Sequence, residues 1–363
     1  MQLIGVPRVS IPTLLAIFAL PLLYILLPTV VGLNGDLKRY GEAGLSLLCS
    51  DGGAILANYK SEPLFIAILW FFAEVWSVLF SSDQADYCLN PGFNVFWLPI
   101  FVATIFILLL IYIVRPLRGA AIYFHLVFCL DTALLMLPFN LLRQFIAVVI
   151  VVALVSLLIR EKISPLAFIA ALVVPALIHW SVWLLFLMGL AATIPSLFLI
   201  AARLSKRAIA AWAGIVCLAL LGVFWGPALY NLFSEKLLPR LDISLSINGW
   251  LHPVTFFVAV FAYAISRHLK QEFARRFIVC ATILYVVITL TGNSLITERM
   301  RTLLVPTAYF VFLYIRATRP LAPAWSVVNV LFVLFALTSF LWNAIVAQPF
   351  AERDSFVQLF ANI

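Results

Sequence analysis

The chain has 363 residues, of which 65% are hydrophobic and only 10% are charged, and its formal net charge is +8. A soluble globular protein is roughly half apolar and about one quarter charged, because its surface must be hydrated. The composition therefore excludes a soluble enzyme, a disordered chain and a small disulfide-rich secreted module. It indicates an all-α polytopic membrane protein, predicted as a single integral membrane domain over residues 1–363.

Apolar runs long enough to cross a bilayer recur along the chain. A helix crosses about 30 Å of hydrocarbon with about 20 residues, because it rises ~1.5 Å per residue. The first run, Ile11–Leu33, carries no charge and no small-residue cleavage site follows it, which predicts a retained span rather than a signal peptide. The pattern predicts about eleven crossings, at residues 11–33, 95–114, 119–138, 142–159, 165–188, 189–204, 209–232, 251–266, 277–292, 301–315 and 323–347.

The direction of the crossings follows from lysine and arginine in the loops, which are enriched on the cytoplasmic side. One set of loops holds 14 basic residues and only two acids, Glu161 and Glu272, whereas the other set holds 9 basic and 13 acidic residues. The first set is therefore predicted to be cytoplasmic, with the N-terminus inside and the C-terminus outside. Its basic residues are Arg8, Arg115, Arg118, Arg160, Lys162, Arg203, Lys206, Arg207, Arg267, Lys270, Arg275, Arg276, Arg316 and Arg319.

Residues 34–94 are predicted to form one large external loop. Pro63–Ser81 is apolar enough to cross, but a crossing there would invert every later loop, so we interpret it as a re-entrant or interfacial helix with both ends external. Tyr40–Cys49 is predicted as a second short interfacial helix. Cys49 and Cys88 then share one oxidising compartment, where a disulfide between them and two unpaired thiols are equally compatible with the sequence.

Three acids lie close to the predicted external surface, and an ionisable residue near a span is a candidate functional group because burying it is costly. Asp36 follows the first span, Glu62 precedes the helix that begins at Pro63, and Asp131 lies about 10 Å below the external surface. Each has a structural alternative. Asp36 can be an ordinary interfacial charge, Glu62 an acid favoured by a helix N-terminus, and Asp131 the partner of a neighbouring helix.

Basic and amide side chains gather at the same external side. Arg143 starts the span 142–159, where the helix dipole disfavours a cation, and Asn140 and Gln144 lie beside it. This combination favours an anion site, with a snorkelling membrane anchor as the alternative. Glu298, Arg299 and Arg301 open the span 301–315, and the two arginines face different directions because they are two residues apart.

His179 lies inside the predicted span 165–188, about 14 residues from its cytoplasmic end and shortly after Pro175. It is either an acid–base group or a core histidine bonded to the backbone carbonyl that the proline leaves without a partner. The sequence leaves these two roles open.

Cations and carboxylates at one membrane depth suit a lipid-linked diphosphate sugar. Arginine forks bind pyrophosphate oxygens in pairs and offset the charge that develops on the leaving group. A carboxylate or a histidine takes the proton from an attacking sugar hydroxyl. Because arginines supply the positive charge, we expect neither a metal ion nor an organic cofactor; a divalent ion held by Asp36 and Glu62 is the alternative.

The order of these motifs resembles the EpsG-like, Wzy-type bacterial polysaccharide polymerases. The resemblance extends from about residue 36 to 310, and each motif alone is short. The matching positions are Asp-x3-Tyr (Asp36, Tyr40), Glu-Pro-x-Phe (Glu62, Pro63, Phe65), Asn-x2-Arg-Gln-x2-Ala (Asn140, Arg143, Gln144, Ala147), a span with His179, and Glu-Arg before a late span (Glu298, Arg299).

The resemblance implies a GT-C-like glycosyltransferase fold in the bacterial inner membrane, with the active site at the periplasmic face. It implies nucleotide-sugar-independent polymerisation of undecaprenyl-diphosphate-linked repeat units for O-antigen, capsule or exopolysaccharide. Expected partners are those lipid-linked glycans, the bilayer, a chain-length regulator and a flippase, and no nucleic acid. The implied catalytic residues are Asp36, Glu62 and His179, and the implied diphosphate- and sugar-binding residues are Arg143, Gln144, Arg299, Glu298, Tyr40 and Asn140. Arg301 joins the predicted binding residues because of its position beside Arg299, and not because of the resemblance.

Two other functions stay open. A GT-C enzyme that adds single sugars from a polyprenyl monophosphate donor needs less positive charge than a diphosphate enzyme. A flippase for lipid-linked oligosaccharides requires polar residues through the whole membrane depth and usually an internal repeat. The polar residues here gather on one side, which favours an enzyme.

Overall fold

The computed structural model describes residues 36–49, 62–80, 88, 91–130, 134, 137–201, 268–290, 294–318, 330, 333, 334 and 337. These residues are almost entirely helical and contain no strand, as the composition predicts. Among them, three helices are long and apolar enough to cross a membrane: Pro63–Phe80, Trp97–Leu117 and Leu142–Ile159. The predicted spans 11–33, 209–232, 251–266 and nearly all of 323–347 lie outside the described residues, so the number of crossings and the GT-C-like fold stay predictions.

The chain divides into two compact units. The first contains residues 1–51, 69–142 and 321–363, and the second contains residues 52–68 and 143–320. Helix α4 (Pro63–Phe80) belongs to the second unit in its first turns and to the first unit in the rest. That both units form one membrane domain stays a prediction.

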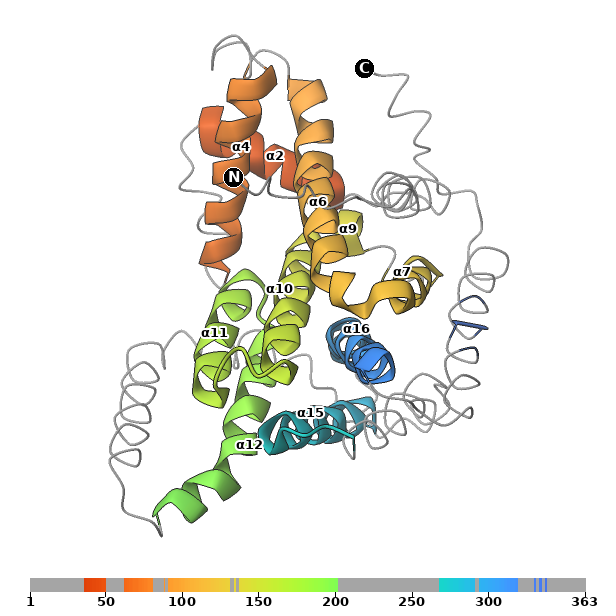
Figure 1. The fold of residues 1–363 in the computed structure, drawn as a ribbon. Helices are drawn as coiled ribbons and strands as arrows, with labels where there is room; N and C mark the ends of the chain where they lie inside the picture. Colours follow the sequence, from red (N-terminus) through yellow and green to blue (C-terminus); the bar gives the residue numbers. More distant parts are fainter. Residues whose placement is uncertain are drawn as a thin grey trace, which may run out of the picture. The chain divides into compact units, whose positions relative to one another are not determined.

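The first unit is organised around helix α6 (Pro91–Val114), which contains the predicted span 95–114. Helix α2 (Asp36–Cys49) packs against α6 and confirms the predicted short helix, although it begins four residues earlier, at Asp36 (Figure 1). A 3-10 turn η1 (Arg115–Ala120) follows α6 and leads into helices α7 (Ala121–Leu130) and α9 (Leu137–Asn140). The last two helices cover part of the predicted span 119–138.

The contact between α2 and α6 depends on Gly41. A Cβ atom at this position would lie 1.8 Å from the carbonyl oxygen of Val95, which is backbone and cannot turn away. We expect Gly41→Ala to lower the free energy of unfolding by about 3 kcal/mol, the upper end of the usual cost of overpacking. Thermal unfolding of the purified chain in detergent measures this. Gly119→Ala is the matched control, because nothing lies within 4 Å of its added Cβ.

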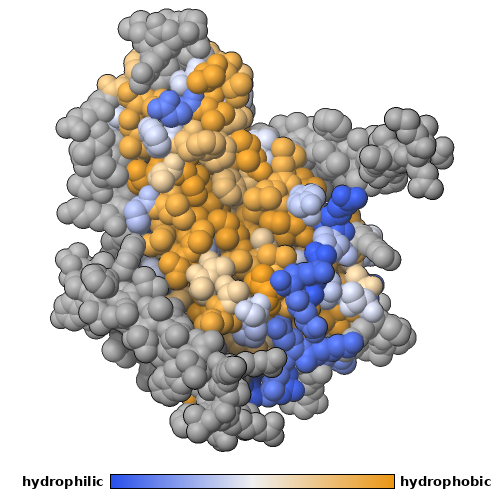
Figure 2. All heavy atoms as spheres, turned by 60° about the vertical axis from the view of Figure 1, so that its left-hand side comes forward, coloured by the Kyte–Doolittle hydropathy of each residue, from blue (hydrophilic) through white to orange (hydrophobic). Residues whose placement is uncertain are grey.

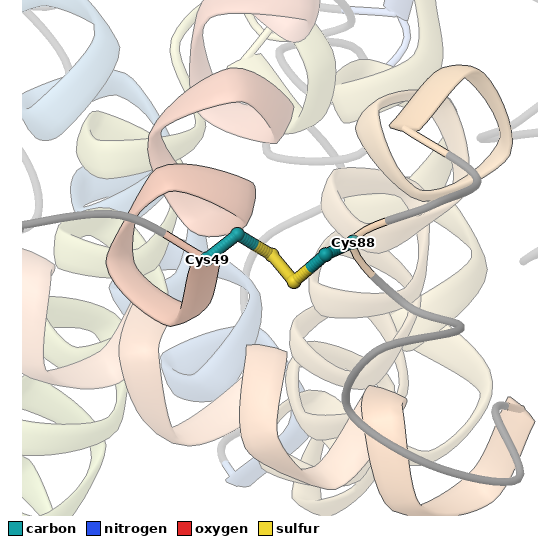
Figure 3. The surroundings of a disulfide bond; sticks show 2 residues. All are labelled: Cys49 and Cys88. Carbon is teal, nitrogen blue, oxygen red and sulfur yellow. A yellow bond between two sulfur atoms is a disulfide. The ribbon is translucent and has the colours of Figure 1, made fainter.

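A disulfide joins Cys49, the last residue of α2, to Cys88, which precedes α6 (Figure 3). Their Cα atoms are 5.7 Å apart. This decides between the two states that the sequence left open. It also requires that the chain on the two sides of α4 returns to one compartment. Helix α4 is unbroken and about 27 Å long, so it does not turn back within its own length, and its orientation in the membrane stays a prediction.

We expect Cys49 and Cys88 to lie on the external side, because disulfides persist in oxidising compartments. After mild reduction, an impermeant maleimide should label both thiols in intact cells or spheroplasts. Labelling of either cysteine only after permeabilisation would contradict the predicted external loop. Single Cys49→Ser and Cys88→Ser variants assign the signal to each position.

Among the residues of the second unit that the structure describes, five longer helices occur. Helix α10 (Leu142–Ile159) has the bounds predicted for the span 142–159. It is followed by α11 (Pro165–Ile178), α12 (Val182–Ala201), α15 (Glu272–Leu290) and α16 (Ser294–Thr318). Neighbouring pairs pack together, with α12 against both α11 and α15, and α15 against α16 (Figure 1). Helix α16 begins well before the predicted span 301–315, and α15 begins before the predicted span 277–292.

The predicted division between spans 165–188 and 189–204 is wrong. The chain turns at residues 179–181 and α12 then continues without a break to Ala201. His179 ends α11 in an extended conformation, with φ −146° and ψ 121°, and its backbone N–H donates to the carbonyl of Pro175. The imidazole Nδ1 accepts from the Ser181 N–H, 3.3 Å, so a local side-chain bond replaces the helical pattern. Hydropathy cannot detect such a turn because it interrupts no apolar run.

Candidate functional site

Glu62 is the centre of a buried polar cluster in the second unit. Its side chain is only 1% exposed, although it lies just before helix α4. The carboxylate forms an ion pair with Arg143 and accepts, through its other oxygen, the backbone N–H of Trp180 at 3.4 Å. Its backbone carbonyl accepts the N–H of Phe65, and this hydrogen bond lies in the first turn of α4. Glu62 therefore joins three segments that are far apart in the sequence.

Arg143 is the second residue of α10, as predicted. The carboxylate of Glu62 and the ring of Phe65, 5.9 Å from the guanidinium carbon, both stabilise its charge. The unfavourable placement of a cation at a helix N-terminus led us to expect an anion from outside the protein; the structure supplies an internal anion. The Arg143 side chain is 27% exposed while Glu62 is buried, so the pair holds the guanidinium at the edge of the cluster.

Gln144, the next residue of α10, holds Arg299 of α16. Its amide oxygen accepts from the Arg299 guanidinium at 2.6 Å, and its amide nitrogen donates to the Arg299 backbone carbonyl at 2.9 Å. The same nitrogen also donates to the hydroxyl of Thr302. Gln144 is fully buried, whereas Arg299 is half-buried. A buried amide thus fixes both the main chain and the side chain of one arginine.

We expected Arg299 to open its helix, but the structure places it further inside the helix. Helix α16 begins at Ser294, so Arg299 lies in its second turn. The orientation of Arg299 therefore depends on its bonds to Gln144 rather than on a helix terminus.

The turn between α11 and α12 lies against Glu62. His179 is buried, and its ring is stacked near Trp180 with centroids 5.9 Å apart. The Nδ1 atom of His179 bonds to both the hydroxyl and the backbone N–H of Ser181, at 2.7 and 3.3 Å. In the neutral ring these two bonds require the proton on Nε2. The Nδ1 atom therefore has an internal partner, as expected for a core histidine, but this partner is Ser181 and not a backbone carbonyl.

The remaining predicted site residues are less fully described. Tyr40 is buried in α2 of the first unit, and Arg301 is half-buried in α16. The structure describes Asp36, Asn140 and Glu298 only as parts of the helices α2, α9 and α16, and Asp131 lies outside the described residues.

Three residues that sequence reasoning did not single out complete the cluster, together with Phe65. Trp180 contributes a backbone N–H, Ser181 and Thr302 contribute hydroxyls, and Phe65 contributes its ring. Phe65 was visible in the Glu-Pro-x-Phe motif, but nothing in the sequence marked the other three. Within the described part of the chain, no three or more His, Cys, Asp or Glu side chains are grouped so that they could hold a metal ion.

Comparison with known proteins adds no relative. No protein-family model, no curated protein and no solved structure matches this chain. The functional assignment therefore depends on the residues of the chain and on the geometry of the second unit.

Proposed function

We propose that the chain is a membrane glycosyltransferase that polymerises undecaprenyl-diphosphate-linked repeat units at the periplasmic face of the bacterial inner membrane. One observation carries this proposal: Arg143 and Arg299 are both partly exposed, and each is held by a buried partner, Arg143 by Glu62 and Arg299 by Gln144, which follows Arg143 on α10. Such fixed guanidinium groups suit the two phosphates of a lipid diphosphate better than a single phosphate. The order of the sequence motifs supports the same substrate.

The proposed reaction transfers a growing glycan from its carrier to a new repeat unit. A hydroxyl at the non-reducing end of the acceptor attacks the anomeric carbon of the donor glycan. The bond from that carbon to the diphosphate oxygen breaks, and the diphosphate leaves with the bonding electron pair. Arg143 and Arg299 offset the negative charge on the leaving group, and a base takes the hydroxyl proton.

Of the three candidate bases, Glu62 is the least suited to proton transfer. Both of its carboxylate oxygens accept bonds inside the protein, so we assign it to orient Arg143. His179 is buried and its Nδ1 is bonded to Ser181. This leaves Asp36, which the order of the sequence motifs implies, as the leading base. His179 carries its proton on Nε2, so it can accept a second proton only at Nδ1, after the bonds to Ser181 open, and it is the second candidate.

The proposed external location agrees with the charge distribution in the second unit. The first turn of helix α10 contains Arg143 of the cluster, and the helix ends at the basic loop that starts with Arg160. The 17 intervening steps of helix cover about 25 Å, which approaches the thickness of the hydrocarbon core. Because basic loops favour the cytoplasm, the cluster is proposed to lie near the opposite surface.

The test is extension of purified lipid-diphosphate-linked repeat units by the full chain in nanodiscs, without any nucleotide sugar. We expect products that are longer by whole repeat units. Addition of single sugars from a polyprenyl monophosphate donor would favour the single-sugar enzyme instead. Movement of the glycolipid between leaflets without extension would favour the flippase.

The same assay identifies the base. Asp36→Asn keeps the shape of the side chain and removes the carboxylate, so we expect it to lower extension by about a hundredfold, within the usual contribution of a general base. His179→Gln should have the smaller effect. Extension at the normal rate by folded Asp36→Asn would transfer the role to His179.

A further inference from the structure

The loop from Arg160 to Ser164 is a rigid turn that displays basic side chains. The N–H of Lys162 donates to the carbonyl of Leu157 and the N–H of Glu161 to that of Leu158, both at 2.9 Å. Glu161 has φ 58°, the left-handed conformation that this pair of bonds requires after a helix end. Ser164 then caps α11 by accepting the N–H of Ala167. Arg160, Glu161 and Lys162 are all exposed.

The start of α15 lies at the same end of the second unit. Phe168, in the first turns of α11, contacts the rings of Phe273 and Phe277 of α15, with centroids 6.1 and 5.0 Å apart. Because Phe168 follows Ser164 by one turn, the loop and the start of α15 are neighbours. Lys270 and Arg275 are exposed beside this contact.

We name the surface of these two segments the basic end; it consists of the exposed residues Arg160, Glu161, Lys162, Lys270, Glu272 and Arg275 and the half-buried Arg276. Five basic and two acidic residues leave a net charge of +3. Glu272 pairs with Arg276 and lies 4.0 Å from Arg275. The two acids offset only two of the five basic charges, so the surface stays positive. The positive charge comes from parts of the chain more than 100 residues apart, which only folding brings together.

We propose that the basic end binds the phosphate headgroups of anionic phospholipids. In Figure 2, hydrophilic residues adjoin apolar ones, as expected where lipid tails give way to headgroups. The exposed apolar side chains of the adjoining helices, among them Leu157, Leu166 and Val174, extend from the basic end along α10 and α11. An anionic lipid matches both parts, since its tails cover these side chains and its phosphate meets the lysines and arginines.

The test titrates short-chain phosphatidylglycerol or phosphatidylcholine into the full chain in a neutral detergent and follows bound lipid by native mass spectrometry. We expect phosphatidylglycerol to bind at least tenfold more tightly. Each basic residue near an anionic surface is worth about 1 kcal/mol, which is roughly a fivefold change in affinity. Lys162→Gln should therefore weaken phosphatidylglycerol binding roughly fivefold, and the triple variant Lys162→Gln, Lys270→Gln, Arg275→Gln roughly a hundredfold.

All three replaced side chains are exposed, so the variants are expected to fold, which size-exclusion chromatography checks. Arg39→Gln is the control, because Arg39 is exposed on α2, outside the basic end, and its loss should leave the lipid preference unchanged. Equal binding of the two lipids by the wild-type chain, or an unchanged preference in the folded triple variant, would overturn the proposal. Neither result depends on the glycosyltransferase activity.

Discussion

Replacing Arg143 or Arg299 by alanine is expected to lower repeat-unit extension by about a hundredfold or more. Each guanidinium is proposed to meet a diphosphate oxygen, and a charge-assisted hydrogen bond contributes about 1.5–3 kcal/mol. A donor that stabilises developing negative charge contributes about 2.7–4 kcal/mol. The lysine variants should recover only part of the rate, because an ammonium keeps the charge but loses the planar fork. The measurement is the extension assay with purified lipid-linked repeat units.

The control for this prediction is Arg115→Ala, which removes an exposed arginine of η1 that has no part in the proposed site. Chromatography and thermal unfolding establish that each variant is folded. If folded Arg143→Ala and Arg299→Ala both extend chains at nearly the wild-type rate, the cluster does not bind the diphosphate and the proposed function fails.

Removing the carboxylate of Glu62 is expected to produce a large loss of stability. Glu62→Leu leaves the charge of Arg143 and the N–H of Trp180 without their buried acceptor. Breaking a buried ion pair from one side costs about 3–5 kcal/mol, and the lower end applies because Arg143 is 27% exposed. Denaturant unfolding in detergent measures the change. Glu272→Gln is the matched control: its carboxylate is 60% exposed, and an exposed pair contributes only about 0.5 kcal/mol.

The double variant Glu62→Leu, Arg143→Leu separates stability from activity. Replacing both partners removes the unpaired charge, so we expect part of the lost stability to return. Extension should stay as low as in Arg143→Ala, because no guanidinium remains. A Glu62→Leu variant no less stable than Glu272→Gln would contradict the buried pair. Recovery of extension in the double variant would contradict a role of Arg143 in binding.

Several parts of the structure could be predicted from local composition. The shortage of charged residues indicates a helical membrane protein, and three of the described helices are long and apolar enough to cross a bilayer. The helix Leu142–Ile159 agrees with the prediction at both ends, because Arg143 and the basic turn after Ile159 bound an uninterrupted apolar run. The costly placement of Arg143 also marked it as a special residue before its partner was known.

The pairing of the polar residues could not be predicted in this way. Glu62 and Arg143 are 81 residues apart, and Gln144 and Arg299 are 155 residues apart. Each pair forms only where two helices meet, and hydropathy along the chain contains no information about which helices are neighbours. The disulfide between Cys49 and Cys88 could not be predicted for the same reason. The sequence contains both cysteines, but it does not give the distance between them in the folded chain.

The turn at His179 shows the same limit at short range. Residues 165–204 form a nearly continuous apolar run, in which residue polarity gives no reason to end a helix at Ile178. The turn depends on two competing bonds from the His179 ring to Ser181 and on the Trp180 N–H that Glu62 accepts from another part of the chain. Apolar run length thus specifies where helices can form in a membrane protein. The hydrogen bonds of a few buried polar groups, which exist only after the helices pack, decide where these helices end and which side chains meet.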